Sequence, residues 1–312
     1  MAPRNEFTLE TFIPVGSEDK FSEPCALGID EAGRGPVMGP MVYGAAFWPL
    51  SEQESIEKLG YDDSKALAEE QRESMFEGIK AHPHIGYTIC NLSAECISCS
   101  MLQEDPISLN RLSHDAAISM IQLAFKKGIN VKEVYVDTVG KAEYYEEKLN
   151  RIFGQKCKVV VCPKADSLYK VVSAASICAK VTRDHAIKEW SFDEKGVTFK
   201  PLNCSGYPSD VNTKTWLREN YDPVFGYPNL VRFSWSTVRN DMDHKQAHLA
   251  GSGTSTLFSD ANPFVRASWP DPAPDDASGS QSILSFVKKA KRERTSYFAS
   301  KNIKRESGLL LA

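Results

Sequence analysis

The stretch CALGIDEAGRGPVMGPMVYGAAFW, residues 25–48, contains two apolar runs joined by a glycine-rich segment. The first run, Cys25–Ile29, is short and ends at Asp30, and the second, Met38–Trp48, is rich in residues that favour β-structure. Two such runs on either side of a turn predict a β-hairpin, and we expect this hairpin to open a sheet.

The segments after the hairpin alternate between helix and strand patterns. They are an exposed helix in 64–81, a strand at 85–91, a helix capped by Ser113 and ended by Gly128, a strand at 131–136, a helix at 142–153, a strand at 157–161, and a long helix from about Asp166. This order predicts an α/β fold with a central five-stranded mixed sheet flanked by helices.

Length and composition indicate a globular chain with extensions. The 312 residues are 42% hydrophobic and 25% charged, which excludes wholesale disorder. We expect an N-terminal extension (1–24), a catalytic core (25–190), a helical C-terminal part of the same domain (191–249), a flexible linker rich in Gly, Ser, Pro and Asp (250–281), and a basic tail (282–312).

The charge balance argues against one way of binding nucleic acid. Lys and Arg total 37 against 41 Asp and Glu, a net charge of -4, so bulk positive charge is excluded as the source of affinity. The tail differs, because 287–306 holds eight Lys or Arg and two Glu, and we assign it to tethering or partner contact.

Targeting and cysteine patterns favour a reducing compartment. The N-terminus lacks the apolar stretch of a signal peptide, and the longest apolar run, Pro36–Leu50, is too short to span a bilayer. Eight cysteines are scattered along the chain, and the pair Cys96 and Cys99 has no second pair at zinc-finger spacing. We therefore expect inert thiols and a cytosolic or nuclear protein without a membrane anchor.

Acidic residues recur where the chain leaves predicted strands. Asp30 and Glu31 follow the first strand, Asp137 ends the strand at 131–136, and Asp166 follows the last strand. Carboxylates gathered at one sheet edge would repel one another, and two hard divalent ions, Mg²⁺ or Mn²⁺, would explain such a cluster. Taken singly, Asp166 is better explained as a helix cap and Asp137 is also explained as a strand end, and only the coincidence of all four carboxylates favours a metal site.

The loop Gly33-Arg34-Gly35 directly follows the acidic pair. Glycines let backbone amides approach an anion, and Arg adds a charged donor, so the loop is suited to a phosphate or a ribose hydroxyl. A tight hairpin turn would require the same glycines.

Ordered motifs along the chain resemble type 2 ribonucleases H, the ribonuclease HII family, in the form typical of the catalytic component of the eukaryotic enzyme. They are DEAGRGPVMGP (30–40), DSK (63–65), VDTVG (136–140), KAD (164–166), SAASICAKVTRD (173–184), SGYP (205–208) and FGYPNLVRFSW (225–235). The resemblance implies a ribonuclease H-like fold with a C-terminal helical extension. It also implies two-metal cleavage of the RNA strand of RNA/DNA hybrids, and nicking 5′ to single ribonucleotides in duplex DNA to leave 3′-hydroxyl and 5′-phosphate ends.

The resemblance also assigns roles to residues. Two Mg²⁺ or Mn²⁺ ions would be held by Asp30, Glu31, Asp137 and Asp166, which would be the catalytic residues; Gly33, Arg34 and Gly35 would recognise the ribose 2′-OH through the backbone, and Tyr207 would lie at the RNA–DNA junction. Lys65, Lys180 and Arg183 are candidate phosphate contacts, for which solvated surface charge or internal ion pairing is an equally open explanation. Cys204 stands where the family has Gly, which affects the loop that carries Tyr207.

Partners and alternatives complete the hypothesis. The resemblance implies a heterotrimer with accessory subunits B and C, a nuclear role in replication and ribonucleotide excision repair, and a substrate of hybrid or ribonucleotide-containing duplex. The tail segment RTSYF (294–298) suits a partner surface or a sliding clamp, although Lys291 stands where the clamp motif has Gln. The alternatives are a DNA nuclease with the same metals and a hybrid-binding protein without catalysis.

Overall fold

The computed structural model describes residues 8–61, 68–192, 194, 198–222, 226–240 and 242. The described parts of Met1–Trp190 and Leu202–Arg239 form one compact unit. The second unit comprises Ser191–Pro201 and the residues from Asn240 on, and within it the rings of Phe192 and Phe199 lie 4.5 Å apart.

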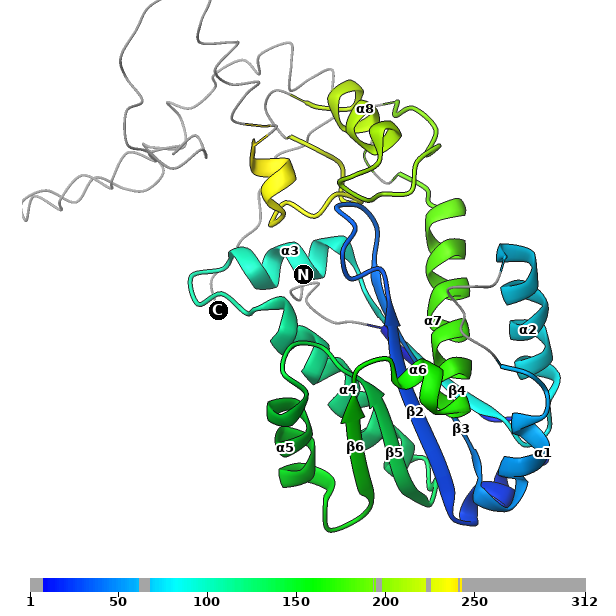
Figure 1. Ribbon diagram of the computed structural model, residues 1–312. Coiled ribbons are helices and arrows are strands. Elements are labelled where there is room, and N and C mark those ends of the chain that lie inside the picture. Colours follow the sequence, from blue (N-terminus) through cyan, green and yellow to red (C-terminus); the bar gives the residue numbers. More distant parts are fainter. Residues whose placement is uncertain are drawn as a thin grey trace, which may run out of the picture. The chain divides into compact units, whose positions relative to one another are not determined.

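A six-stranded mixed sheet forms the centre of the first unit (Figure 1). Its strands, in spatial order, are β1 (Thr8–Phe12), β4 (Gly86–Leu92), β3 (Met41–Pro49), β2 (Cys25–Ala32), β5 (Val131–Asp137) and β6 (Lys158–Cys162). β2 and β3 form the expected antiparallel hairpin, while β5 runs parallel to both β2 and β6. The α/β class and the mixed sheet are confirmed.

The five expected strands are joined by a sixth from the N-terminal extension. β1 pairs antiparallel with β4, where Phe12 stacks on Tyr87 at 5.2 Å and the hydroxyls of Thr11 and Thr88 lie 3.0 Å apart. Its alternating exposed and half-buried side chains fit an edge strand with one face against the protein.

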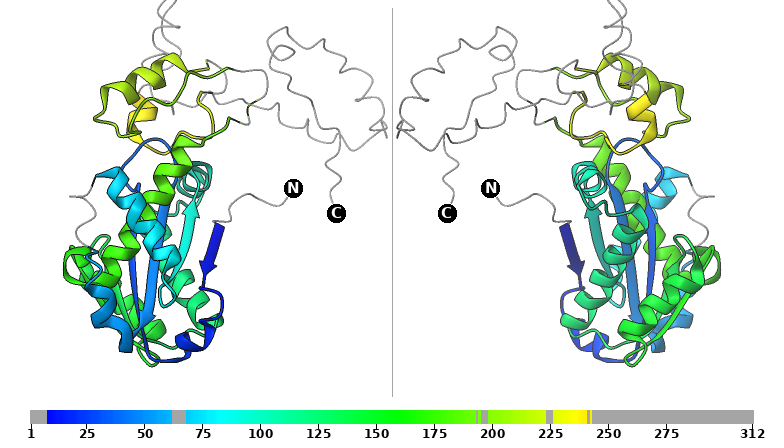
Figure 2. Two further views of the ribbon diagram at one scale, coloured as in Figure 1. Left: turned by 90° about the vertical axis from the view of Figure 1, so that its right-hand side faces the viewer. Right: turned by 90° about the vertical axis from the view of Figure 1, so that its left-hand side faces the viewer.

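Helices cover both faces of the sheet (Figure 2). The helices of the described residues are α1 (Gln53–Glu57), α2 (Glu69–Ala81), α3 (Ala94–Leu102), α4 (Leu109–Lys126), α5 (Ala142–Phe153), α6 (Ala165–Leu168), α7 (Lys170–Lys188) and α8 (Val211–Glu219), which lies beyond the end of the sheet (Figure 1), with 3₁₀ turns at Glu18–Ser22 and Leu50–Glu52. One apolar core joins the sheet to α3, α4 and α5, and a second joins it to α1, α2 and α7. The first unit thus has three layers, with helices on either side of the sheet.

Two expected helix starts are wrong. Ser108, not Ser113, caps α4, since its hydroxyl accepts the Arg111 N–H at 3.2 Å, and Ser113 is buried inside the helix. The expected long helix from Asp166 is broken at Tyr169, whose extended backbone (φ -124°) separates α6 from α7. Asp166 lies in the first turn of α6 rather than at its cap.

α7 lies against the sheet at backbone distance. A Cβ on Gly28 would fall 2.4 Å from the backbone of Val171, and one on Gly44 would fall 2.3 Å from the carbonyl oxygen of Ala175. Only glycine permits this approach of helix to strand. It brings the polar side chains at the middle of α7 within reach of β2.

The segment 202–239 packs on the loop that follows β2. The Val37 N–H donates to the Gly206 carbonyl at 2.7 Å, and the Arg232 N–H donates to the Val37 carbonyl at 2.8 Å. The predicted linker at 250–281, the tail at 282–312, the RTSYF segment and Lys65 all lie outside the described residues. Within the described part of the chain, no helix has both the length and the apolarity needed to cross a bilayer.

Candidate active site

Two strand ends bring the first carboxylates together. Ile29 of β2 is in register with Val136 of the parallel strand β5, so the next residues, Asp30 and Asp137, lie at neighbouring positions of the same sheet edge. Asp166 reaches this edge from α6, and it is almost fully buried. The Ala165 N–H donates to Oδ1 of Asp137 at 3.0 Å, which ties the start of α6 to the end of β5.

Lys164 makes the turn that allows this contact. It is the N-cap of α6 and, among the described residues other than glycine, it alone has a positive φ, 57°. A left-handed conformation costs a side-chain-bearing residue about 1–2 kcal/mol. The strained residue therefore lies at the turn from β6 into α6 that brings Asp166 to the same sheet edge as Asp137.

The environment of Asp30 opposes its ionisation. Burial is the main cause, and the charges of Asp137 and Asp166 add to it, so that the pKa of Asp30 is raised to about 7 even though hydrogen bonds from Ser176 and from the Glu31 N–H lower it. The Glu31 N–H donates to Oδ1 of Asp30 at 2.8 Å. The three aspartates are thus close enough to repel one another.

Glu31 belongs to the opposite side of the strand. Successive side chains of a strand alternate between faces, and the charge of Glu31 raises the pKa of Tyr43 and of Tyr145, in both cases after the larger effect of burial. Glu31 also lines the large cavity described below. The structure therefore groups Asp30, Asp137 and Asp166. Glu31, the next residue of β2, lines the cavity on the other side of the strand.

The carboxylate oxygens suit a hard divalent cation, but the side chains do not yet form a complete coordination shell. Carboxylate oxygen is what Mg²⁺ and Mn²⁺ prefer, and a cation would relieve the repulsion that raises the pKa of Asp30. Over the part of the chain that is described, no three His, Cys, Asp or Glu side chains already lie at metal-binding spacing. The residues fit the ion by chemistry and charge.

A buried arginine that the sequence did not reveal holds the glycine loop. The Arg232 side chain is fully buried and donates three hydrogen bonds to backbone carbonyls: Nη2 to Gly33 at 2.6 Å, Nη1 to Arg34 at 3.1 Å and Nε to Gly39 at 2.9 Å. Trp235 adds a bond from Nε1 to the Gly35 carbonyl at 3.1 Å. The carbonyls of all three loop residues are therefore engaged inside the protein.

The Arg34 side chain turns away from the loop. Its guanidinium donates to Oγ of Ser113 at 2.6 Å and to the side-chain oxygen of Asn110, both on α4. Arg34 is thus an anchor between loop and helix, and the backbone N–H groups are the part of the loop suited to a ligand. Ser113, mistaken for a cap, serves this anchor.

Tyr207 lies on a loop with its own supports. The side chain of Asp210 accepts bonds from the Ser205 N–H at 2.9 Å and from the Ser205 hydroxyl at 2.8 Å, which lower its pKa to about 2. The positive φ in this loop is at Gly206, 77°, whereas Cys204 has an ordinary backbone conformation, so its replacement of Gly introduces no strain. The half-exposed ring of Tyr207 points toward Gly35, where a Cβ would lie 3.5 Å from Cε1.

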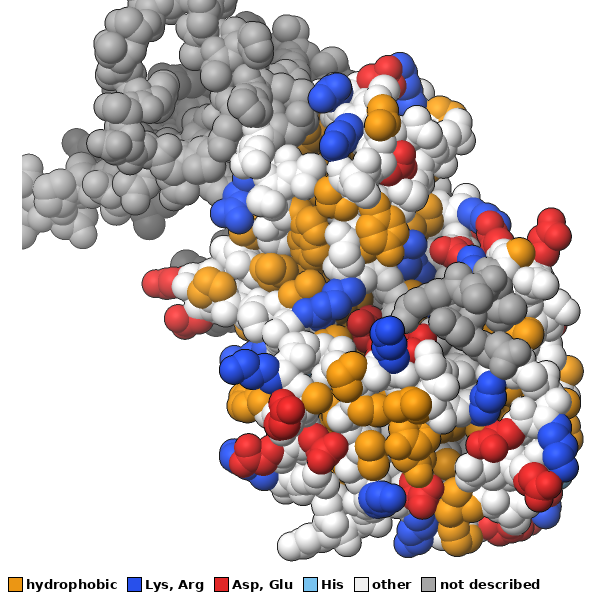
Figure 3. Space-filling view, in the orientation of Figure 1, with side chains coloured by type: hydrophobic (Ala, Val, Ile, Leu, Met, Phe, Trp, Pro, Cys, Tyr) orange, Lys and Arg blue, Asp and Glu red, His pale blue; other side chains and the backbone are white. Residues whose placement is uncertain are grey.

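These parts surround a cavity of about 810 Å³. Glu31, the glycine loop, Tyr207 and cations from α2 and α7 line it: Arg72, Lys180, Arg183 and Lys188. On the face shown in Figure 3, acidic side chains near the middle of the molecule are bordered by basic ones. The cavity therefore presents cations beside the carboxylate edge, although Asp184, which pairs with Arg72 and Arg183, and Glu69, which pairs with Lys188, line it too.

Lys180 and Arg183, predicted as phosphate contacts, differ in exposure. Both line the cavity, but Arg183 is nearly buried, forms an ion pair with Asp184 at 3.7 Å, and lies 5.9 Å from the centre of the Tyr207 ring. Its aliphatic part packs against Gly33. Arg183 thus connects the loop to Tyr207, while the more accessible Lys180 is better placed for a ligand.

The mixed sheet flanked by helices on both faces is the architecture of the ribonuclease H-like class. The ribonuclease HII family model matches residues 27–238. The chain belongs to this family, and it is an endoribonuclease of the ribonuclease H type.

Relatives and solved structures agree with this assignment. The chain is 50% identical to the A component of Bos taurus ribonuclease H2 over 71% of its length and 74% of the relative, and 47% identical to that of Dictyostelium discoideum over 72% and 80%. Ribonuclease H2 from Pyrococcus horikoshii OT3 superposes with a TM-score of 0.56 at 32% identity, covering 69% of this chain and 96% of the other. Ribonuclease HII of Archaeoglobus fulgidus, solved in complex with PCNA, gives the same TM-score and identity, with 68% and 95% covered.

Proposed function

We propose that this chain hydrolyses the RNA strand of RNA/DNA hybrids and nicks duplex DNA 5′ to single embedded ribonucleotides, leaving 3′-hydroxyl and 5′-phosphate ends. The observation that carries the proposal is the register of β2 with β5 and the contact of α6 with Asp137, which support a shared sheet edge for Asp30, Asp137 and Asp166 next to the glycine loop. A polynucleotide hydrolase that uses divalent cations needs such an acidic edge.

Two Mg²⁺ or Mn²⁺ ions would be held by Asp30, Glu31, Asp137 and Asp166. When bound, they would supply a water of lowered pKa and stabilise the leaving oxygen. The protein's own contribution is position: Ser176 and the Glu31 N–H orient Asp30, and the Ala165 N–H orients Asp137.

Selectivity for RNA would come from the loop. Arg232 and Trp235 hold the carbonyls of Gly33, Arg34 and Gly35 and so fix the loop, whose backbone N–H groups would contact a 2′-OH, the group that separates RNA from DNA. Tyr207 would stack on the neighbouring sugar, and Lys180 would contact a phosphate.

The test uses duplexes that differ in a single 2′-OH. Incubated with Mg²⁺, the protein should nick a DNA duplex holding one ribonucleotide and leave the all-DNA duplex intact, and chelation should stop cleavage. Asp137→Asn should lose turnover by at least about 1,000-fold and bind Mn²⁺ more weakly by calorimetry, while still binding the duplex. Equal cutting of both duplexes would refute ribose recognition, and absence of cleavage even with the accessory subunits B and C would refute the activity.

The relatives are named as the A component of ribonuclease H2, which supports a complex of this chain with accessory subunits B and C. We also propose nuclear roles in ribonucleotide excision repair and removal of RNA primers. The Archaeoglobus structure with PCNA supports testing the segment 294–298 for clamp binding. Co-purification of the three subunits, with and without residues 282–312, would test both contacts.

A further inference from the structure

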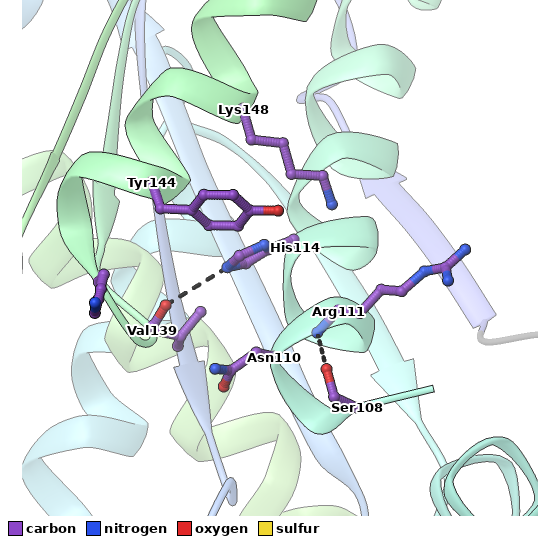
Figure 4. Close-up of a pocket in the computed structure, with 8 residues that line it drawn as sticks. Ser108, Asn110, Arg111, His114, Val139, Tyr144 and Lys148 are labelled. Carbon is purple, nitrogen blue, oxygen red and sulfur yellow. Dashed lines mark hydrogen bonds between the residues drawn. The ribbon is translucent and has the colours of Figure 1, made fainter. Parts of the chain in front are cut away.

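A second cavity lies between the start of α4 and the start of α5 (Figure 4). It encloses about 580 Å³ and is lined by Ser108, Asn110, Arg111, His114, Val139, Lys141, Tyr144 and Lys148. We name it the α4–α5 pocket. Among the described residues, it shares no lining residue with the cavity that contains Glu31 and Tyr207.

The lining is basic. Arg111, Lys141 and Lys148 provide three positive charges, and none of the described residues that line the pocket is acidic. Asp115 offsets one charge from outside it, through ion pairs to Lys148 at 3.2 Å and to Arg111 at 3.7 Å. Burial is the main cause that lowers the pKa of His114, which sits near Lys148 and Arg34, so the imidazole is biased toward its neutral form.

The pocket also offers an aromatic surface. The Tyr144 side chain is 62% exposed, and Figure 4 shows its ring and the Lys148 chain projecting from α5 toward α4. His114 is buried, stacks on Tyr145 at 3.9 Å and contacts the Val139 carbonyl at 3.5 Å. A buried floor thus carries an accessible ring, whose apolar face suits a sugar, and exposed cations, which suit phosphates.

Its position links the pocket to the active site. Val139 is two residues beyond Asp137 at the end of β5, which places it within about 7 Å along the chain. The side chain of Asn110 accepts a hydrogen bond from Arg34 of the glycine loop. The same side chain packs against Gly140, where a Cβ would lie 3.1 Å from Nδ2 of Asn110. One residue of the lining therefore joins the loop to the segment after Asp137.

We propose that the α4–α5 pocket binds backbone phosphates of the nucleic-acid duplex outside the reaction site, through Arg111 and Lys141 with Tyr144 against the sugar. This inference rests on the proposed function, because it extends the same duplex across the carboxylate edge. The pocket adds affinity without reading sequence, as phosphate contacts do. The pocket is locally positive, although the whole chain has a net charge of -4.

The test is the salt dependence of duplex binding. Arg111→Gln/Lys141→Gln removes two exposed charges, and neither side chain caps a helix. Each lost phosphate contact lowers the slope of log affinity against log salt by about 0.9. We expect the slope to fall by between about 1 and 2, so that the ratio of wild-type to variant affinity narrows by about 4- to 16-fold between 50 and 200 mM salt.

The matched control is Lys126→Gln/Lys127→Gln, which removes the same charge at the opposite, exposed end of α4. Binding is measured to a duplex holding one ribonucleotide, and cleavage of the same duplex is measured in parallel. The expected loss falls on Kd and KM and is absent from the control. If wild type cleaves and the two double variants show the same slope, the pocket does not bind the duplex, and an acidic protein partner becomes the better occupant. If wild type binds but does not cleave, the proposed function fails while the slope still decides the pocket.

Discussion

Arg232 provides the sharpest test of how the glycine loop is held. Replacing it with Met keeps much of the buried volume but removes the donors to the carbonyls of Gly33, Arg34 and Gly39. Each buried carbonyl left without its partner costs about 1–3 kcal/mol. The loss is reduced because burial of the guanidinium is itself unfavourable, which lowers the pKa of Arg232 to about 9. We therefore expect a net destabilisation of about 3–5 kcal/mol.

Arg232→Lys separates charge from geometry. Lysine keeps the positive charge but cannot reproduce the three-pronged fork, so it should lose nearly as much stability as Arg232→Met. Urea unfolding followed by circular dichroism gives the free energy of unfolding. Cleavage, measured at a temperature where the variants remain folded, should fall at least about tenfold, with poorer discrimination between ribonucleotide-containing and all-DNA duplexes.

The control is Arg151→Met, which removes an exposed arginine whose partner is Glu147 on the same helix. It should leave the unfolding midpoint and the cleavage rate unchanged. If Arg232→Lys unfolds and cleaves as wild type does, the fork geometry does not hold the loop, and the reasoning is refuted.

Three further predictions concern the same framework. Gly33→Ala places a Cβ 2.3 Å from the Arg183 side chain at φ +80°, and it should lower the free energy of unfolding by about 2–4 kcal/mol and reduce ribonucleotide selectivity. Its control, Gly60→Ala, has a similar φ of +79° but open space around the Cβ, and should lower the free energy of unfolding by only about 1 kcal/mol. The pKa of Asp210 is lowered from 3.8 to about 2, so the carboxylate stabilises the folded state fully above about pH 4 and loses this effect as the pH falls toward 2. The melting temperatures of wild type and Asp210→Asn should therefore differ at pH 5 and converge at pH 2. Lys164→Gly should relieve the left-handed strain and match or exceed wild-type stability, and a lower melting temperature would show that the Lys164 side chain contributes more than the backbone costs.

Local patterns predicted most of the sheet and its helices. The hairpin of β2 and β3 and the bounds of α5 follow from apolar spacing, because each signal lies within a dozen residues. The start of α4 could not be decided this way, since Ser108 and Ser113 are both good caps. In the fold Ser108 caps the helix, and the hydroxyl of Ser113 accepts a hydrogen bond from Arg34 of a distant loop. β1 was missed because an edge strand is defined by its partner β4, far along the sequence.

The residues of the candidate site likewise fall into those that local sequence predicts and those that only the packing reveals. That Asp30 and Asp137 share one sheet edge was predictable because both stand near the ends of strands, which is a local signal, whereas Asp166 reaches the edge from α6. Arg232 was not, since nothing in its neighbourhood indicates that its guanidinium reaches the loop 198 residues earlier in the chain. Arg183 was predicted as a ligand contact, but its burial against Gly33 and its position by Tyr207 depend on α7 lying against the sheet, which only the three-dimensional packing determines.

Charge is the property that sequence averages describe worst here. The net value of -4 excludes affinity from a uniformly positive surface. The fold nevertheless places the cations of α2 and α7 in one cavity and those of α4 and α5 in another, with the carboxylates at the sheet edge near both. Because exposed charges are screened beyond about 10 Å, a duplex would meet these local groups rather than the mean. Local groups of this kind let a protein whose total charge is negative bind a polyanion.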